Sequence, residues 1–292
     1  MRRRILQGFI SVGVLIAIAF GISTTTHAQE AGDFSLQVSP SPIVTLIAPG
    51  TTKEIDLQVR NNGTVAEELK IEPRSFKIDN QTGQVILSDT ELPEVAPWIS
   101  FSSPVFVTKP GETFSQKVRI ALPKDTGFSY SLALVISRTK SIDPQAAGGR
   151  ALKGSLAIFT LMNVDRPGAT RKLEIESLES EKDTYEYLPA TLKVKFKNVG
   201  NTIIQPYGDV FIYQGSDTKK PLAHMAVNDK KGYILPGSSR ILQTEWSDGF
   251  PVFETSTVTG GTVKMEEKWD FSKLSNLRIG PYTAKVVAAY ND

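Results

Sequence analysis

Short segments that alternate apolar and polar residues, separated by turn residues, run through most of the chain. Residues 54–60 alternate charged or amide side chains with Ile55, Leu57 and Val59, and a strand with this pattern buries one face. An Asn-Asn-Gly-Thr turn follows, and residues 68–72 resume the alternation. These two segments are predicted to pair as a hairpin. Because no stretch has sustained helical periodicity, the chain is predicted to be all-β.

The same alternation continues through both halves of the chain. Segments 192–198, 209–213 and 240–246 repeat it in the second half. Two nearly continuous apolar runs, 132–136 and 156–161, are predicted central strands, because strands buried on both faces lose the alternation.

Turn signals recur in front of the alternating strands. Three Pro-Gly pairs hold this position, and in such a pair proline fixes φ while glycine accepts the positive φ of a type II turn. The run Arg60–Thr64 also resembles Lys197–Asn201. These repeats predict two immunoglobulin-like sandwiches of about seven strands each. The Pro-Gly pairs are Pro49-Gly50, Pro110-Gly111 and Pro236-Gly237.

A boundary between the two sandwiches is predicted at Asp165–Ala169, where a Pro-Gly pair ends one strand before a new alternating series begins. The predicted organisation is a signal segment over residues 1–28, a first immunoglobulin-like β-sandwich over residues 29–166, and a second over residues 170–292.

The N-terminus has the features of a secretory signal. Arg2–Arg4 precede an apolar segment over residues 5–22, and Thr26 and Ala28 supply the small residues that a signal peptidase requires. Cleavage before Gln29 is therefore predicted. The alternative is an uncleaved anchor, since roughly 18 apolar residues are at the lower edge of what spans a bilayer. In either case the protein is expected to be exported.

Composition excludes several classes of function. Residues 1–28 hold three arginines and no acidic residue, so the processed chain would keep 30 of the 33 basic residues beside 31 acidic ones. This near-neutral balance argues against nucleic-acid binding, which requires clustered positive charge. The chain has no cysteine, which excludes disulfides and thiolate chemistry. No second apolar run reaches membrane-spanning length.

Candidate catalytic residues have simpler explanations. His224, the one histidine after the signal segment, is placed as an ordinary strand residue, and no nucleophile-elbow motif occurs. Glu245 and Asp248 flank Trp246, and a strand would point Glu245 and Trp246 to opposite faces. Residues 79–83 lack the acidic spacing of a calcium loop and predict a hairpin turn. No catalytic residue, cofactor or metal site is therefore predicted, and a hydrolase is the least favoured function.

The strand and turn sequences resemble those of a known family. Residues 38–59, VSPSPIVTLIAPGTTKEIDLQV, residues 196–213, FKNVGNTIIQPYGDVFIY, and residues 280–290, GPYTAKVVAAY, are similar to the two sandwiches of the WxL-interacting surface-protein family. The resemblance implies a bacterial envelope protein that binds peptidoglycan or a WxL-domain protein. It also implies a transmembrane helix after the second domain, which the chain as given lacks.

Export, two sandwiches and the missing catalytic set predict a binding or adhesion module of the cell envelope. The expected partner is a cell-wall polymer or another envelope protein, with a membrane contacted only through the N-terminal segment or a missing C-terminal anchor. The alternative is a structural spacer or stalk. Because loops at sandwich ends carry recognition, seven loop residues are candidates: Asn62, Asn80, Gln81, Gln145, Arg150, Asp248 and Phe250.

The C-terminal segment predicts an incomplete sheet. Residues 282–290 have the pattern of a core strand, which in such sandwiches is followed by a further edge strand. An open edge is therefore predicted beside residues 282–290. Two explanations follow: the sequence stops before its last strand, or a strand from another chain completes the sheet.

Overall fold

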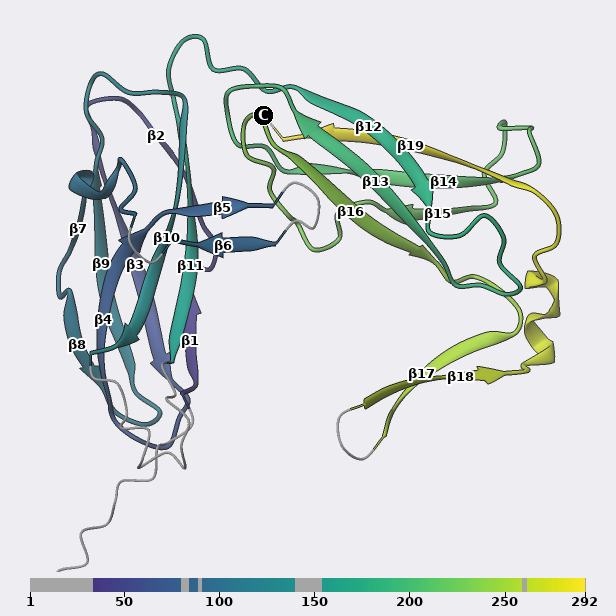
Figure 1. Cartoon of the computed structure of the whole chain (residues 1–292), viewed down its shortest axis with the longest axis horizontal. Helices are drawn as coiled ribbons and strands as arrows, with labels where there is room; N and C mark the ends of the chain where they lie inside the picture. The colour runs from purple at the N-terminus through teal and green to yellow at the C-terminus, as the bar shows by residue number, and fades with distance from the viewer. Residues whose placement is uncertain (1–33, 80–83, 89–90, 140–153, 259–261, 292) are drawn as a thin grey trace, which may run out of the picture.

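The computed structural model contains two tandem immunoglobulin-like β-sandwiches, as predicted (Figure 1). It describes residues 34–79, 84–88, 91–139, 154–258 and 262–291. The predicted signal segment and its cleavage site therefore lie outside the described residues. The long axes of the two sandwiches cross rather than continue one another (Figure 1).

The first sandwich packs a four-stranded sheet against a five-stranded sheet. The four-stranded sheet has the order β1 (Leu36–Ser39), β3 (Thr52–Asn61), β9 (Thr113–Ala121), β7 (Ile99–Phe101). The five-stranded sheet has the order β2 (Ile43–Ile47), β11 (Ser155–Val164), β10 (Ser129–Arg138), β4 (Glu67–Arg74), β8 (Val105–Thr108). The short helix η1 (Ala96–Trp98) precedes β7, and the hairpin of β5 (Phe76–Ile78) and β6 (Val85–Leu87) projects toward the second sandwich (Figure 1).

The strand count exceeds the expected seven because two strands change sheets. The first strand divides into β1, which pairs with β3, and β2, which pairs in parallel with β11. The fourth divides into β7, which pairs with β9, and β8, which pairs with β4. Prolines stand at both crossings, at Pro40, Pro42 and Pro104, and proline cannot continue a ladder because it lacks an N–H.

The predicted hairpin of residues 54–60 and 68–72 is wrong. Both segments are strands, with Leu57, Val59 and Leu69 fully buried, but they belong to different sheets. The turn between them crosses the sandwich, and the buried Asn61 side chain replaces hairpin bonds by donating to Val65 O (2.8 Å) and Thr108 O (3.1 Å). Alternation defines a buried face but does not choose the neighbouring strand.

The predicted central strands are confirmed. Strands β10 and β11 lie inside the five-stranded sheet, and Leu132, Leu134 and Ile158 are fully buried. The buried faces of both sheets meet in one core. Glu67 and Arg138 form an ion pair at its edge, with side chains only 5% and 6% exposed.

The second sandwich packs two three-stranded sheets. One has the order β12 (Leu173–Ser180), β13 (Ala190–Asn198), β16 (Ser239–Trp246), and the other the order β15 (Ala223–Ala226), β14 (Pro206–Gln214), β19 (Tyr282–Tyr290). A separate hairpin of β17 (Val252–Val258) and β18 (Thr262–Lys268) leads into the short helix η2 (Phe271–Asn276). Asp248 and Phe250, which were expected in a recognition loop, lie in the short connection between β16 and β17.

The repeated turn sequences have matching structures. Asn198 is fully buried like Asn61, and its amide donates to Thr202 O (2.8 Å) and Ile234 O (2.9 Å). The side-chain oxygen of each asparagine accepts the N–H of the residue two positions later. The glycines of the three Pro-Gly pairs have φ of 72°, 75° and 70°, which confirms the predicted turns.

The predicted open edge is confirmed for the described part of the chain. Strand β19 pairs with β14 on one side, and none of the described strands pairs with its other side. Between the sandwiches, the connection runs from Val164 to Leu173. The domain limits predicted at residues 166 and 170 fall in this connection and stay a prediction.

At the junction, side chains of the first sandwich form hydrogen bonds with main-chain groups of the loop that follows β13. The Asn163 amide donates to Ile203 O (2.9 Å) and its oxygen accepts Ile203 N (2.8 Å). Ser129 Oγ donates to Asn201 O (3.1 Å). The last two strands of the first sandwich therefore contact one loop of the second directly.

Candidate functional site

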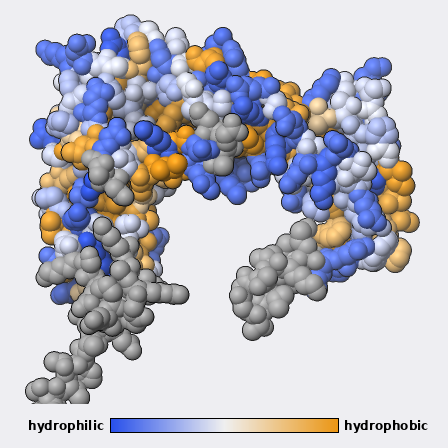
Figure 2. All heavy atoms as spheres, viewed as in Figure 1, coloured by the Kyte–Doolittle hydropathy of each residue, from blue (hydrophilic) through white to orange (hydrophobic). Residues whose placement is uncertain are grey.

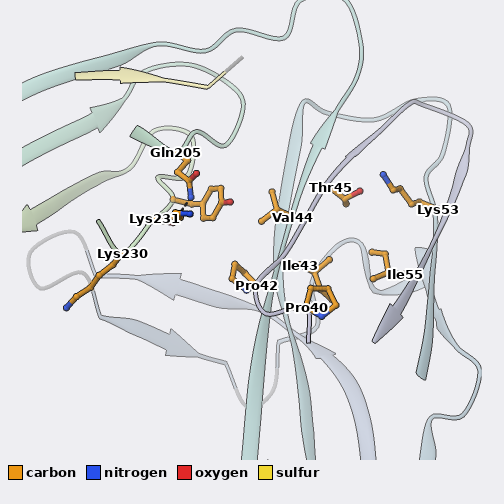
Figure 3. Close-up of a pocket in the computed structure, with 11 residues that line it drawn as sticks. Pro40, Pro42, Ile43, Val44, Thr45, Lys53, Ile55, Gln205, Lys230 and Lys231 are labelled. Atoms are coloured by element: carbon orange, nitrogen blue, oxygen red, sulfur yellow. Dashed lines mark hydrogen bonds between the residues drawn. The ribbon is translucent and has the colours of Figure 1, made fainter. Parts of the chain in front are cut away.

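A cleft lies where the two sandwiches meet. It has a volume of about 490 Å³. Strand β2 and the turn before it form one wall, with Pro42 and Val44, and two loops of the second sandwich form the other, with Gln205 and Lys231 (Figure 3). These walls are far apart in the sequence and meet only after both sandwiches have folded.

The first wall follows from the sheet change of β2. The inward residues Ile43 and Ile47 are buried at 2% and 3% exposure, whereas Val44 and Leu46 point outward and are 47% and 49% exposed. Lys53 Nζ lies 3.4 Å from Leu46 O. The wall is thus an apolar strip with an amine at one end.

The second wall is a loop held by its own side chains. Asn228 Nδ2 donates to Pro206 O (2.7 Å) and Gly232 O (2.9 Å), and Gln205 Nε2 donates to Lys231 O (2.6 Å). Lys231 itself has a positive φ of 52°. Non-glycine residues rarely adopt this conformation, so the surrounding hydrogen bonds must hold the loop in it.

The electrostatic character of the cleft is positive. Lys53, Lys230 and Lys231 line it, and its described lining includes no carboxylate. The Lys230 side chain extends away from β2 toward the rim (Figure 3). Behind this wall, burial lowers the pKa of Arg240, whose guanidinium donates to Tyr233 O (2.8 Å). Positive charge beside an apolar strip suits a protein segment that carries acidic groups.

Further apolar residues lie on the same outer side of the five-stranded sheet. Ile86 on the β5–β6 hairpin is 59% exposed, and Val105 and Val107 on β8 are 54% and 56% exposed. The register places Val107 opposite Glu68 and Val105 opposite Lys70, so charged residues of β4 divide this surface. Figure 2 shows apolar surface on the side of the first sandwich that faces the second.

The three predicted recognition residues that the structure describes do not line this cleft. Asn62 is exposed at the turn after β3, where its side-chain oxygen accepts Arg60 Nε (3.1 Å). Asp248 accepts Arg278 Nη2 and Asn276 Nδ2, each at 2.6 Å, so it fastens a turn to η2. Their roles in recognition stay a prediction.

Phe250 is only 5% exposed, because its ring packs against the rings of Trp269 (5.5 Å between centroids) and Phe271 (5.7 Å). This packing leaves its ring little surface for a partner. Four candidates lie outside the described residues: Asn80, Gln81, Gln145 and Arg150.

The cleft residues were missed because their sequence signals are weak. The run Ile43–Ile47 is wholly apolar except for Thr45, so it gave no sign that two of its residues point to solvent. Lys230 and Lys231 form a common pair of surface lysines in the sequence. Only the contact between the sandwiches brings them to β2.

The residues weighed for catalysis occupy ordinary positions. His224 is on β15, as predicted, with its side chain 70% exposed and Nδ1 3.4 Å from Asp209 Oδ1. Trp246 is buried while Glu245 is exposed, which confirms that they face opposite sides. Strands β5 and β6 flank residues 79–83, which confirms the hairpin. Within the described ranges, His, Cys, Asp and Glu form no group of three arranged for a metal.

None of the helices in the described part of the chain is long and apolar enough to cross a membrane.

Comparisons with known proteins found no matching family model and no matching curated protein. Among solved structures, a chain of the chaperone–tip adhesion subunit complex CsuC–CsuE of Acinetobacter baumannii is 13% identical, with 80% of this chain and 98% of that chain covered and a TM-score of 0.39. The Escherichia coli chaperone DraB is 14% identical, with 80% and 97% covered and a TM-score of 0.38.

The Pseudomonas aeruginosa chaperone CupB2 is 12% identical to the chain, with 80% and 99% covered and a TM-score of 0.37. TM-scores this low support no conclusion about partner or activity. The resemblance to the WxL-interacting family is not tested by these comparisons and stays a prediction.

Proposed function

We propose that the protein is an exported, non-catalytic binding protein of the cell envelope, and that its cleft holds a segment of another envelope protein. The observation that carries the proposal is the cleft itself, in which the exposed aliphatic residue Val44 lines one wall and Lys231 the other. Apolar contact supplies affinity, and the lysines select a segment with acidic side chains or a terminal carboxylate.

The composition of the cleft favours a protein over a cell-wall polymer. Sugar-binding surfaces need many hydrogen-bonding groups, whereas the wall on β2 offers aliphatic side chains with Thr45 as its polar member. If the resemblance to the WxL-interacting family holds, the partner is a WxL-domain protein. The experiment below identifies the partner without that assumption.

Site-specific photo-crosslinking tests the proposal. A benzophenone amino acid is placed at Val44 in the cleft and, as a matched control, at Ile241, which is exposed on β16 and does not line the cleft. Both variants are exposed to envelope protein extract and, separately, to purified cell wall. We expect one protein adduct from the Val44 position and none from the control.

Charge reversal supplies the second measurement. The double variant Lys230→Glu, Lys231→Glu should reduce the Val44 adduct about tenfold or more, because like charges then face an acidic segment. Equal adducts from Val44 and Ile241, or an adduct with cell wall alone, would contradict the proposal. A phenotype unchanged by this double variant would favour the spacer role.

A further inference from the structure

Asn163 joins the two sandwiches through a pair of hydrogen bonds. Its amide donates to Ile203 O (2.9 Å), and its side-chain oxygen accepts Ile203 N (2.8 Å). One side chain thus bonds to both main-chain groups of one residue, as the main chain of a neighbouring antiparallel strand does. Ile203 is only 5% exposed although it is part of neither hydrophobic core. The two sandwiches therefore meet at a defined contact.

This contact lies close to both walls of the cleft. Asn163 is on β11, which pairs directly with β2, the strand of the first wall. Ile203 is two residues before Gln205, whose side chain donates to Lys231 O (2.6 Å) in the second wall. The path from one wall to the other through Asn163 is therefore short, and each part of it is held by hydrogen bonds.

The covalent connection between the sandwiches is fixed on both sides of a short hinge, which consists of Pro167 and Gly168. Before the hinge, Arg166 donates to Thr126 O of the first sandwich. After it, Asn201 of the second sandwich accepts Thr170 N (2.7 Å). Gly168 has a φ of 90°, a conformation that favours glycine. Rotation of one sandwich relative to the other would therefore be concentrated at these two residues.

We propose that Asn163 is a positioning residue for the cleft: its two bonds to Ile203 hold the hinge in one orientation and so set the distance between β2 and the loop that carries Lys231. Without these bonds the hinge can rotate, and a bound segment can no longer contact both walls at once. The effect on binding rests on the proposed function of the cleft, whereas the orientation of the sandwiches can be measured without a partner.

The distance between two spin labels, measured by double electron–electron resonance, reports the orientation. The chain has no cysteine, so Glu54→Cys on β3 and Gln243→Cys on β16, both at exposed positions, place one label on each sandwich. With Asn163 unchanged, we expect one narrow distance distribution. Asn163→Ala should broaden it to about twice the width or more, because rotation at the hinge is released.

The matched control is another asparagine-like amide that bonds within one sandwich only. The Gln58 side chain donates to Ser115 Oγ (3.0 Å), and both residues belong to the four-stranded sheet. Gln58→Ala removes this amide and should leave the distance distribution unchanged.

A carboxyl group at position 163 separates the loss of the two bonds from damage to the fold. Asn163→Asp in its ionised form turns an oxygen toward Ile203 O, so the distribution should be broad at neutral pH. The protonated carboxyl donates to Ile203 O as the amide does, so the distribution should become narrow again as the pH falls through the pKa of the introduced group. Asn163→Ala at the same pH values should stay broad, which controls for titration of other groups such as Asp165.

The photo-crosslink at Val44 measures the consequence for binding. With a limiting amount of envelope protein extract, Asn163→Ala should lower the Val44 adduct about tenfold, because apparent affinity falls with the fraction of molecules whose walls are at the binding distance. Gln58→Ala should leave the adduct unchanged.

Three results would overturn the inference. One is an unchanged distance distribution in Asn163→Ala, and another is a distribution in Asn163→Asp that stays broad at every pH. The third is an undiminished Val44 adduct from Asn163→Ala when its distance distribution is broad. If the unmodified protein gives no Val44 adduct at all, the proposed function of the cleft fails, and the distance measurements still decide whether Asn163 holds the hinge.

Discussion

Replacing Asn198 by alanine should destabilise the second sandwich severely. The side chain is fully buried and bonds to Thr202 O, Ile234 O and Gly200 N. Alanine removes the donor to Thr202 O and the acceptor of Gly200 N, whereas Ile234 O keeps Ile204 N as a donor (3.2 Å), and each group that loses its partner costs about 1–3 kcal/mol. The expected loss in the free energy of unfolding is therefore about 2–6 kcal/mol, a large part of the roughly 5–15 kcal/mol typical of a domain.

Two further variants separate this mechanism from a general effect of mutating the turn. Asn198→Asp keeps an acceptor for Gly200 N but turns an oxygen toward two carbonyls, so it should cost at least as much as alanine. Val199→Ala changes the exposed neighbour and should cost no more than about 0.5 kcal/mol.

Urea unfolding followed by tryptophan fluorescence measures these differences. A Trp98→Phe background removes the reporter of the first sandwich and leaves Trp246 and Trp269, which report on the second. The reasoning fails if Asn198→Ala unfolds at the same urea concentration as Val199→Ala, or if Asn198→Asp is as stable as the unchanged protein.

Three other predictions follow from the structure. Leu57→Ala, at a fully buried core position, should cost about 2–5 kcal/mol in denaturant unfolding, and a smaller loss would mean that the core relaxes around the cavity. Glu67→Gln should cost about 3–5 kcal/mol because Arg138 loses its carboxylate partner, whereas changing both residues to methionine should recover most of that loss. Partial burial raises the pKa of Glu72, but hydrogen bonds, chiefly from Arg74, outweigh it and leave the pKa below its ordinary 4.5. The carboxylate then stabilises the fold above that value and ceases to do so as the pH falls further. Thermal unfolding of Glu72→Gln should consequently depend less on pH below about 4.5 than that of the unchanged protein.

The sequence defined most strands and the turns between them. Alternation identified Leu57 and Val59 as buried, since a strand exposes its two faces at every second residue. The Pro-Gly pairs identified three turns, since few other residues accept positive φ. The repeat of Asn61 and Asn198 was visible as a turn, but its buried hydrogen bonds were not, because their acceptors include residues distant in the chain.

The cleft could not be predicted from the sequence for a related reason. The chosen loop residues were selected as polar and exposed, and the structure places Phe250 in an aromatic cluster and Asp248 in a network of hydrogen bonds. The cleft instead combines an apolar strand with a lysine pair that lies far away in sequence. An apolar strand and a pair of surface lysines are each common in β-proteins, so neither one alone indicates a binding site.

Local sequence thus determined which residues form strands, which face of each is buried, and that β19 pairs on one side only among the described strands. Only the tertiary structure decided that β3 and β4 lie in different sheets, that β2 crosses to β11, and that β2 meets the loop carrying Lys231. The physical reason is that side-chain periodicity records the environment of each strand, whereas the choice of neighbouring strand depends on main-chain hydrogen bonds that every sequence can make.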